Sequence, residues 1–208
     1  GTIDADNLDY LKRDAMFTGL KLEYDERIFS VFRVDRPTQQ LYVDLGRSGY
    51  LKEAVLSEVI RCLEARFYFS ERVYYHHAKI AAGSLVAKAV EIVLLENAVS
   101  FEQLQVSTDA GLFDLLANAD IKDTHSRELL NIYLHALKRR QLPKRAAVYP
   151  VYANAQAQEE LVAKYFGAGS ANHRRKVESK MTAELYKLTG RLIPFMLYCP
   201  SSKMQLKQ

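Results

Sequence analysis

Residues 50–98 read YLKEAVLSEVIRCLEARFYFSERVYYHHAKIAAGSLVAKAVEIVLLENA and decide the fold class of this chain. Apolar side chains recur in them at three- and four-residue spacing, as one buried face of a helix requires. Helices of globular proteins average roughly 10–14 residues, so this stretch is long for a single one. The pattern therefore predicts two helices, antiparallel or kinked, with a break near Ser70 or near His77.

Capping residues predict further helices on both sides of this stretch. Residues 6–14 form a short helix that Gly19 can close in a left-handed conformation. Ser100, with Gln103 at the capping-box position, predicts a helix start at residue 101. Later helices are expected from Thr108 or Asp109 to about 119, from Asp123 or Thr124 to 140, over 156–166 and over 171–188.

Strand signals are few and short. Residues 27–35 and 40–45 are rich in β-branched and aromatic residues around a turn with Pro37, which predicts a hairpin. Residues 145–151 and 192–199 are also β-like. We therefore expect a mainly α fold with a small β-hairpin and a C-terminal α+β unit. The expected domains are residues 1–98 and residues 99–208.

The amino-acid composition limits the classes of protein to which this chain can belong. Apolar residues make up 49% of the 208 residues and charged residues 26%, which is ordinary for a soluble globular protein. Cys62 and Cys199 are the only cysteines, which excludes a zinc ribbon or a disulfide scaffold and fits a reducing, cytoplasmic compartment. The most apolar stretch, 81–95, is interrupted by Lys88 and Glu91, so no membrane partner is expected.

The net charge of +4 hides an asymmetry. Residues 1–135 hold 15 basic and 21 acidic side chains, whereas residues 136–208 hold 14 basic and 4 acidic ones. A basic surface of this kind attracts phosphates, whether of a nucleotide or of a nucleic acid. The alternative is an ordinary solvated basic face, and the sequence leaves both open.

The first predicted helix gathers Asp6, Asp9, Tyr10 and Arg13 on one face by their spacing. Carboxylates on one face can bind a divalent metal or accept hydrogen bonds from ribose hydroxyls. They can equally well do no more than complement the helix dipole.

Three motifs carry a family resemblance. Residues 3–19, IDADNLDYLKRDAMFTG, resemble the "DADRxDYLxRDxxxTG" segment of HD-domain phosphohydrolases, in the branch of deoxynucleoside triphosphate triphosphohydrolases. Residues 65–77 are similar to that branch's "ARYxMYxxVYxHxxxR" helix, and residues 25–29 to its "DxxRL" motif. Residues 137–145 resemble the C-terminal region of bacterial members. The resemblance implies that residues 1–98 are the C-terminal part of an HD domain.

The resemblance also implies a divalent metal, whether Mg, Mn, Fe or Zn. In such enzymes a His, a His-Asp pair and a later Asp bind it, and Asp6 matches the last of these. The sequence holds no His-Asp dipeptide, and all five histidines follow Asp6. We therefore expect the other ligands in a segment upstream of Gly1, and no metal bound tightly by this chain alone.

Nucleotide contacts are implied by the same resemblance. Tyr10 and Asp14 match positions that recognise the deoxyribose and its 3′-hydroxyl, with Asp14 in the catalytic set. Arg66 matches a phosphate-binding arginine, and Tyr74 a tyrosine against sugar or base. Arg27 matches a regulatory nucleotide position. Alternatively, Arg66 pairs with Glu71, Asp14 or Asp9, and Tyr74 and Tyr75 are aromatics that only pack.

One position departs from the family pattern. Asn7 stands where these enzymes usually carry an Arg or Lys that contacts phosphate. Two functions therefore remain: a metal-dependent phosphohydrolase that converts deoxynucleoside triphosphates to deoxynucleoside and triphosphate, and a non-catalytic HD-derived module that binds nucleotide or nucleic acid and oligomerises.

A homo-oligomer, or association with the upstream part of the same protein, is expected if part of the HD domain lies elsewhere. Apolar side chains of residues 50–98 would then be left bare within this chain and would seek a partner. The candidates are Val59, Cys62, Phe67, Phe69, Ile80, Val86, Val90 and Val93.

Overall fold

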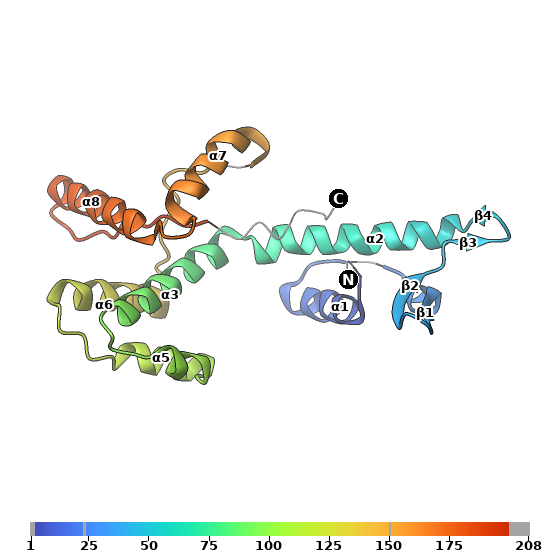
Figure 1. Ribbon diagram of the computed structural model, residues 1–208, viewed down its shortest axis with the longest axis horizontal. Helices are drawn as coiled ribbons and strands as arrows, with labels where there is room; N and C mark the ends of the chain where they lie inside the picture. The colour runs from blue at the N-terminus through green and yellow to red at the C-terminus, as the bar shows by residue number, and fades with distance from the viewer. Residues whose placement is uncertain (1–2, 23, 150, 200–208) are drawn as a thin grey trace. The chain divides into compact units, whose positions relative to one another are not determined.

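The computed structural model describes residues 3–22, 24–149 and 151–199, which belong to two compact units, Gly1–His76 and His77–Gln208. Each unit has its own hydrophobic clusters. Figure 1 follows the chain from α1 to α8 by colour. The mainly α class with a small hairpin is confirmed.

The first unit is built on two helices and two short hairpins. Its elements are α1 (Ala5–Thr18), the 3-10 helix η1 (Glu26–Val31), β1 (Phe32–Asp35), β2 (Gln40–Val43), β3 (Gly46–Arg47), β4 (Tyr50–Leu51), α2 (Glu53–Phe69) and the π-helix η2 (Ser70–Tyr74). Leu8 of α1 packs with Ile28 and Cys62, and Leu11 with Phe69. These contacts hold α1 and η1 against α2.

The second unit is helical wherever regular structure is described. Its helices are α3 (His77–Leu95), α4 (Phe101–Gln105), α5 (Asp109–Ala117), α6 (Thr124–Arg139), α7 (Val151–Phe166) and α8 (Ala171–Thr189). Val93 of α3, Leu116 of α5 and Leu130 of α6 meet in one buried cluster. Residues of α7 pack on α8.

The predicted helix ends are confirmed where local chemistry sets them. Gly19 and Gly190 close α1 and α8 in the left-handed region, at φ 71° and 66°. Ser100 and Gln103 form the predicted capping box, and Thr108 and Asp123 cap α5 and α6. The predicted break near Ser70 or His77 is confirmed, since α2 ends at Phe69 and α3 begins at His77.

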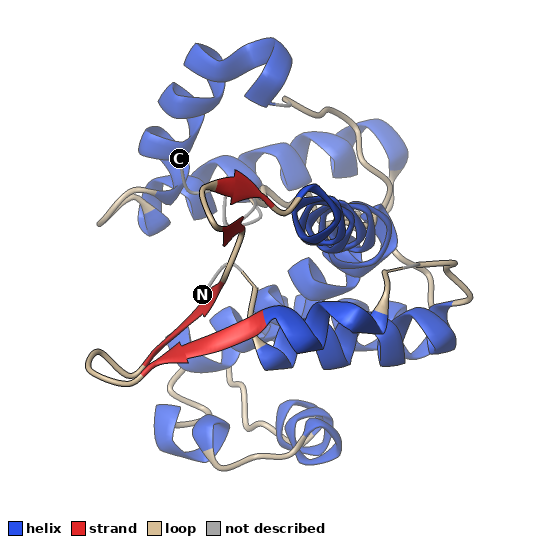
Figure 2. Ribbon diagram, turned by 90° about the vertical axis from the view of Figure 1, so that its right-hand side faces the viewer, coloured by secondary structure: helices blue, strands red, loops and turns tan. Residues whose placement is uncertain are grey.

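The predicted hairpin is confirmed in its strands but not in its full length. β1 and β2 pair antiparallel, drawn as red arrows in Figure 2. In this pairing Arg33 lies opposite Tyr42. Residues 27–31 are a 3-10 helix, not a strand. The Asp25 side chain accepts a hydrogen bond from the Arg27 N–H, which starts a turn, and the turn buries Ile28.

The two strands predicted in the C-terminal part are wrong for the residues the structure describes. Residues 145–149 and 192–199 have no regular structure, and residue 150 lies outside the description. In the second segment, backbone groups use helix side chains in place of a partner strand. The Phe195 N–H donates to Thr182 Oγ1 at 2.9 Å and the Leu197 N–H to Glu178 Oε1 at 2.8 Å.

The compact units divide between His76 and His77, because α3 packs on α5 and α6 of the second unit. The proposed family-domain boundary between residues 98 and 99 stays a prediction.

The expected bare faces are mostly covered within the chain. Cys62, Phe69 and Val93 are buried, so the expectation of exposure is wrong for these three. Val59, Ile80, Val86 and Val90 are half-buried. Phe67 is 56% exposed and remains a candidate for a partner contact.

Candidate functional site

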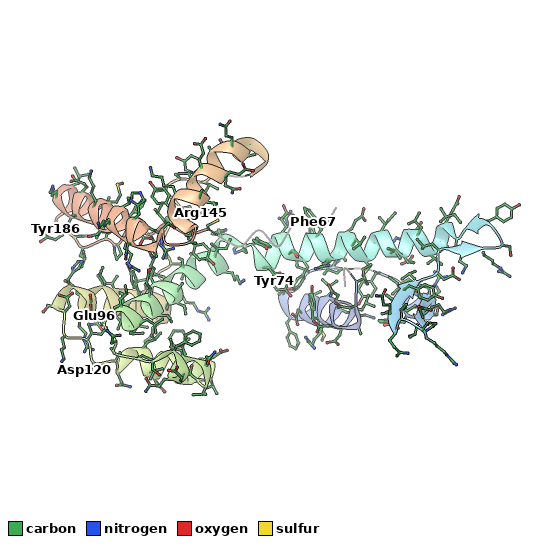
Figure 3. All side chains as sticks on the ribbon, viewed as in Figure 1. Phe67, Tyr74, Glu96, Asp120, Arg145 and Tyr186 are labelled. Atoms are coloured by element: carbon green, nitrogen blue, oxygen red, sulfur yellow. The ribbon has the colours of Figure 1, made fainter. Side chains whose placement is uncertain are left out.

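Three aromatic rings form the centre of the candidate site in the first unit. Tyr10 comes from α1, Phe69 from the end of α2 and Tyr74 from η2. The ring centroids of Tyr10 and Tyr74 lie 6.1 Å apart, and Phe69 meets Tyr74 edge-on at 5.1 Å. Figure 3 shows Tyr74 on the side of α2 that faces α1, and Phe67 on the opposite side. Tyr74 therefore packs, as the alternative interpretation expected, and does so beside Tyr10.

The π-turn of η2 places Tyr74 there. The Tyr75 N–H donates to the Ser70 carbonyl at 2.9 Å, a bond that spans five residues where a regular helix spans four. In a regular helix Val73 would lie over Phe69, four residues before it. The longer turn also brings Tyr74 onto the Phe69 ring, while Val73 packs against the same cluster.

Arg66 reaches the same face. Burial raises the pKa of the Tyr10 phenol above its ordinary value, while the charge of Arg66 and hydrogen bonding with it act in the opposite direction. The carboxylate of Asp6 adds to the increase. Arg66 therefore reaches the Tyr10 hydroxyl, and Asp6 lies within electrostatic range of it.

Asp14 lies within electrostatic range of the second tyrosine. Burial raises the pKa of Tyr74, and the charges of Asp14 and Asp6 contribute to the same shift. The Asp14 carboxylate also accepts from Arg13 at 3.3 Å. The structure thus brings together five of the predicted site residues, namely Asp6, Tyr10, Asp14, Arg66 and Tyr74.

Arg27 is not part of this group. Its guanidinium pairs with Asp25, two residues away, and its side chain is 81% exposed at the start of η1. The hydrogen bonding with Arg27 lowers the pKa of Asp25. The regulatory nucleotide role of Arg27 stays a prediction.

Asn7 has a structural role that the sequence alone did not indicate. It is buried, and both its backbone N–H and its amide donate to the carboxylate of Asp4, the N-cap of α1. The Tyr10 hydroxyl donates to the side-chain oxygen Oδ1 of Asn7 at 3.5 Å. An aspartate three residues before an amide at a helix start is the signal that could have revealed this cap.

A depression lies on another flank of α2. It has a volume of about 280 Å³ and is lined by Lys21, Leu22, Arg61, Glu64, Ala65 and Tyr68. Glu64 and Tyr68 are two residues from Arg66, so they point to the opposite side of the helix. The five site residues therefore form a shared face rather than the wall of this depression.

A metal site needs more ligands than this face of the first unit provides. Within residues 3–22, 24–149 and 151–199, no three His, Cys, Asp or Glu side chains are grouped so that they could hold a metal ion. Asp6 supplies one carboxylate, whereas tightly held divalent ions need several ligands. The described residues thus do not fit a complete metal centre, and the role of Asp6 as a ligand stays a prediction.

A second cluster of charged residues, not anticipated as a unit, lies in the interior of the second unit. The Lys88 ammonium of α3 lies 2.7 Å from Glu91 and 2.6 Å from Glu178 of α8. Arg174 of α8 contacts Glu91 at 2.8 Å, and its guanidinium lies over the ring of Phe166 at 5.3 Å. The cluster thus joins α3 to α8.

The electrostatics of this cluster depend on its burial and its pairing. Burial acts to raise the pKa of Glu91, but Lys88 and Arg174 outweigh it and leave that pKa below its ordinary value. Burial, with the nearby charges of Glu178 and Glu91, raises the pKa of Tyr133 to about 12. Only the α3 part of this cluster had a signal in the sequence, since Lys88 and Glu91 interrupt the apolar stretch three residues apart.

No helix in the described part of the chain is both long enough and apolar enough to cross a membrane.

Comparison with known proteins gives one family. A family model described as "HD associated region" matches residues 51–184, which is well over half of the chain. No curated protein matches the sequence.

Proposed function

Because the chain belongs to the family of HD-associated regions, and is therefore HD-domain-related, we propose that its first unit forms one side of a nucleotide phosphohydrolase site. The substrates are deoxynucleoside triphosphates, and the products are deoxynucleoside and triphosphate. The full site includes metal ligands from outside the described residues.

The observation that carries this proposal is the meeting of Arg66, Tyr10 and Tyr74 with two carboxylates around one aromatic cluster. A guanidinium suits phosphate oxygens, because its fork of donors matches them. Tyrosine rings pack against sugar or base and keep a polar end for hydrogen bonding. A carboxylate such as Asp14 accepts from a sugar hydroxyl.

Each residue has a task that its position allows. Arg66 binds and orients the phosphate chain, and Tyr10 and Tyr74 hold the sugar against α1. Asp14 fixes the 3′-hydroxyl. Asp6 would contribute one carboxylate to the divalent ion, which when bound supplies an activated water and charge stabilisation.

The test compares two arginines of the same helix. In calorimetric titrations of this chain with deoxynucleoside triphosphates, Arg66→Ala should weaken binding about tenfold or more, because a charge-assisted hydrogen bond contributes about 1.5–3 kcal/mol. Arg61→Ala removes an arginine from the other flank of α2, where Arg61 pairs with Glu58. It should change affinity less than about twofold, since exposed pairs contribute little.

Two results would overturn the proposal. One is an equal loss of affinity in the Arg66→Ala and Arg61→Ala variants. The other is that the unaltered chain does not bind deoxynucleoside triphosphates. Circular dichroism of each variant shows whether the helices are retained.

The second function left open by the sequence is a non-catalytic binding module. It is favoured by a row of exposed basic side chains on α8 in the second unit.

A further inference from the structure

One face of α8 carries a row of exposed basic side chains. His173, Lys176, Lys180 and Lys187 are spaced by three, four and seven residues, which places them on one side of the helix. All four are exposed, whereas Glu178 and Thr182 on the opposite side are buried. Since each residue adds about 1.5 Å along a helix, Lys176 and Lys180 are about 6 Å apart along the axis.

Two of these lysines lack an acidic partner. Among the described residues, no carboxylate lies within ion-pair distance of Lys176 or Lys180, while Lys187 pairs with Glu184 at 3.1 Å. Glu178, the other acidic residue of α8, already pairs with Lys88. This face therefore has a local positive charge that the described residues do not neutralise.

Aromatic rings lie at the start of this row, at the end of α7 and the beginning of α8. These two helices follow each other along the chain in Figure 1. The rings of Tyr165 and His173 stack in parallel, with centroids 5.4 Å apart and planes at 4°. The Lys164 ammonium lies 5.3 Å from the Tyr165 ring. His173 is exposed, so this flat pair borders solvent beside the lysines.

We propose that this α7–α8 surface, made of Lys164, Tyr165, His173, Lys176 and Lys180, binds single-stranded nucleic acid. Regularly spaced cations track the phosphates of a backbone, and unpaired bases stack on exposed rings. A duplex hides the faces of its bases, so it can use only the lysines. This inference concerns residues of the second unit and is independent of the proposed nucleotide site.

Fluorescence anisotropy with a labelled single-stranded 20-mer oligonucleotide tests the surface. Lys176→Glu with Lys180→Glu should weaken binding by the chain at least about tenfold. It should also lower the slope of log affinity against log salt by about 1.4, because each phosphate contact on a single strand contributes about 0.7. Tyr165→Leu with His173→Ala should weaken single-strand binding about fivefold or more and leave duplex binding unchanged, since stacking contributes about 1–3 kcal/mol per base.

The matched control changes net charge equally at another site. Lys79 and Lys122 are exposed lysines of the same unit, so Lys79→Glu with Lys122→Glu should reduce affinity less than about threefold. Equal loss in this control would show general attraction to a basic protein and overturn the proposal. It is likewise overturned if a duplex of the same sequence or polyglutamate binds as tightly as the single strand, or if no binding occurs at low salt. These outcomes do not involve Arg66, so they are distinct from failure of the nucleotide site.

Discussion

Glu91 shows how a charged residue inside the second unit depends on its neighbours. Its carboxylate faces Lys88 of its own helix and both Arg174 and Arg175 of α8, and Tyr133 of α6 lies near enough for its pKa to be affected. The net effect is a pKa below the ordinary value of 4.5. Such a group stabilises the fold above its unfolded pKa and loses that contribution as pH falls through its folded pKa.

We therefore expect Glu91→Gln to lower the free energy of unfolding at pH 7 by about 1–3 kcal/mol, because it leaves the half-buried Arg174 and Arg175 without their charged partner, whereas Lys88 keeps Glu178. Its stability should also fall less steeply than that of the unaltered chain as pH drops below about 4.5. The matched control is Glu184→Gln on α8, whose exposed pair with Lys187 should contribute less than about 0.5 kcal/mol. Urea denaturation from pH 7 to below about 4.5 measures the free energy of unfolding of both variants. If that free energy fell in parallel with pH for Glu91→Gln and Glu184→Gln, the proposed role of Glu91 would be contradicted.

At the scale of elements, two glycines should respond oppositely to the same substitution. Gly190 closes α8 with φ at 66°, a region that disfavours a side chain, so Gly190→Ala should destabilise by about 1 kcal/mol. Gly83 lies inside α3, where an added Cβ would meet only the Tyr198 hydroxyl at 3.9 Å. Gly83→Ala should therefore stabilise by about 0.5–1 kcal/mol. Thermal unfolding of both variants checks the two signs, and a destabilised Gly83→Ala would refute the second.

Elements whose signals are local could be predicted from the sequence. Ser100, Asp123 and Gly19 cap helices through backbone groups within four residues. The helix ends that they form can therefore be inferred from the local sequence alone. The run 192–199 has strand composition, but its backbone donates to Thr182 and Glu178. Composition does not reveal such a partner, because β-propensity describes a half-buried surface and not the element that covers it.

The candidate site was predictable only in part for the same reason. The motifs grouped Tyr10, Arg66 and Tyr74 as one set, and the structure brings them to one face. The cluster of Lys88 with Glu178 joins residues 90 positions apart, so spacing rules could not detect it.

At the scale of the whole molecule, the two units have separate hydrophobic clusters. Leu11, Ile28 and Cys62 belong to the first unit, and Leu130 to the second. No described residue belongs to a cluster of both units. Opening of one unit should therefore be detectable without opening of the other.

Cys62 is a probe for this independence, because it is 1% exposed and burial raises the pKa of its thiol. In a Cys199→Ser background, Leu11→Ala should speed thiol labelling of Cys62 about tenfold or more, since a buried Leu→Ala change costs about 2–5 kcal/mol. Leu130→Ala is an equally buried change in the other unit and should leave the labelling rate within about twofold. Equal acceleration by both changes would mean that the units unfold together.

The five-residue turn at Ser70–Tyr74 also bears on how this protein can evolve. A helix tolerates many exchanges of one residue type for another, and this segment also tolerates a change in length. Loss of one residue between Ser70 and Val73 would restore a regular helix in which Tyr74 is the fourth residue after Phe69, so it would still lie over that ring. Descendants can therefore keep Tyr74 beside Tyr10 with one residue fewer here, even where their individual residues drift.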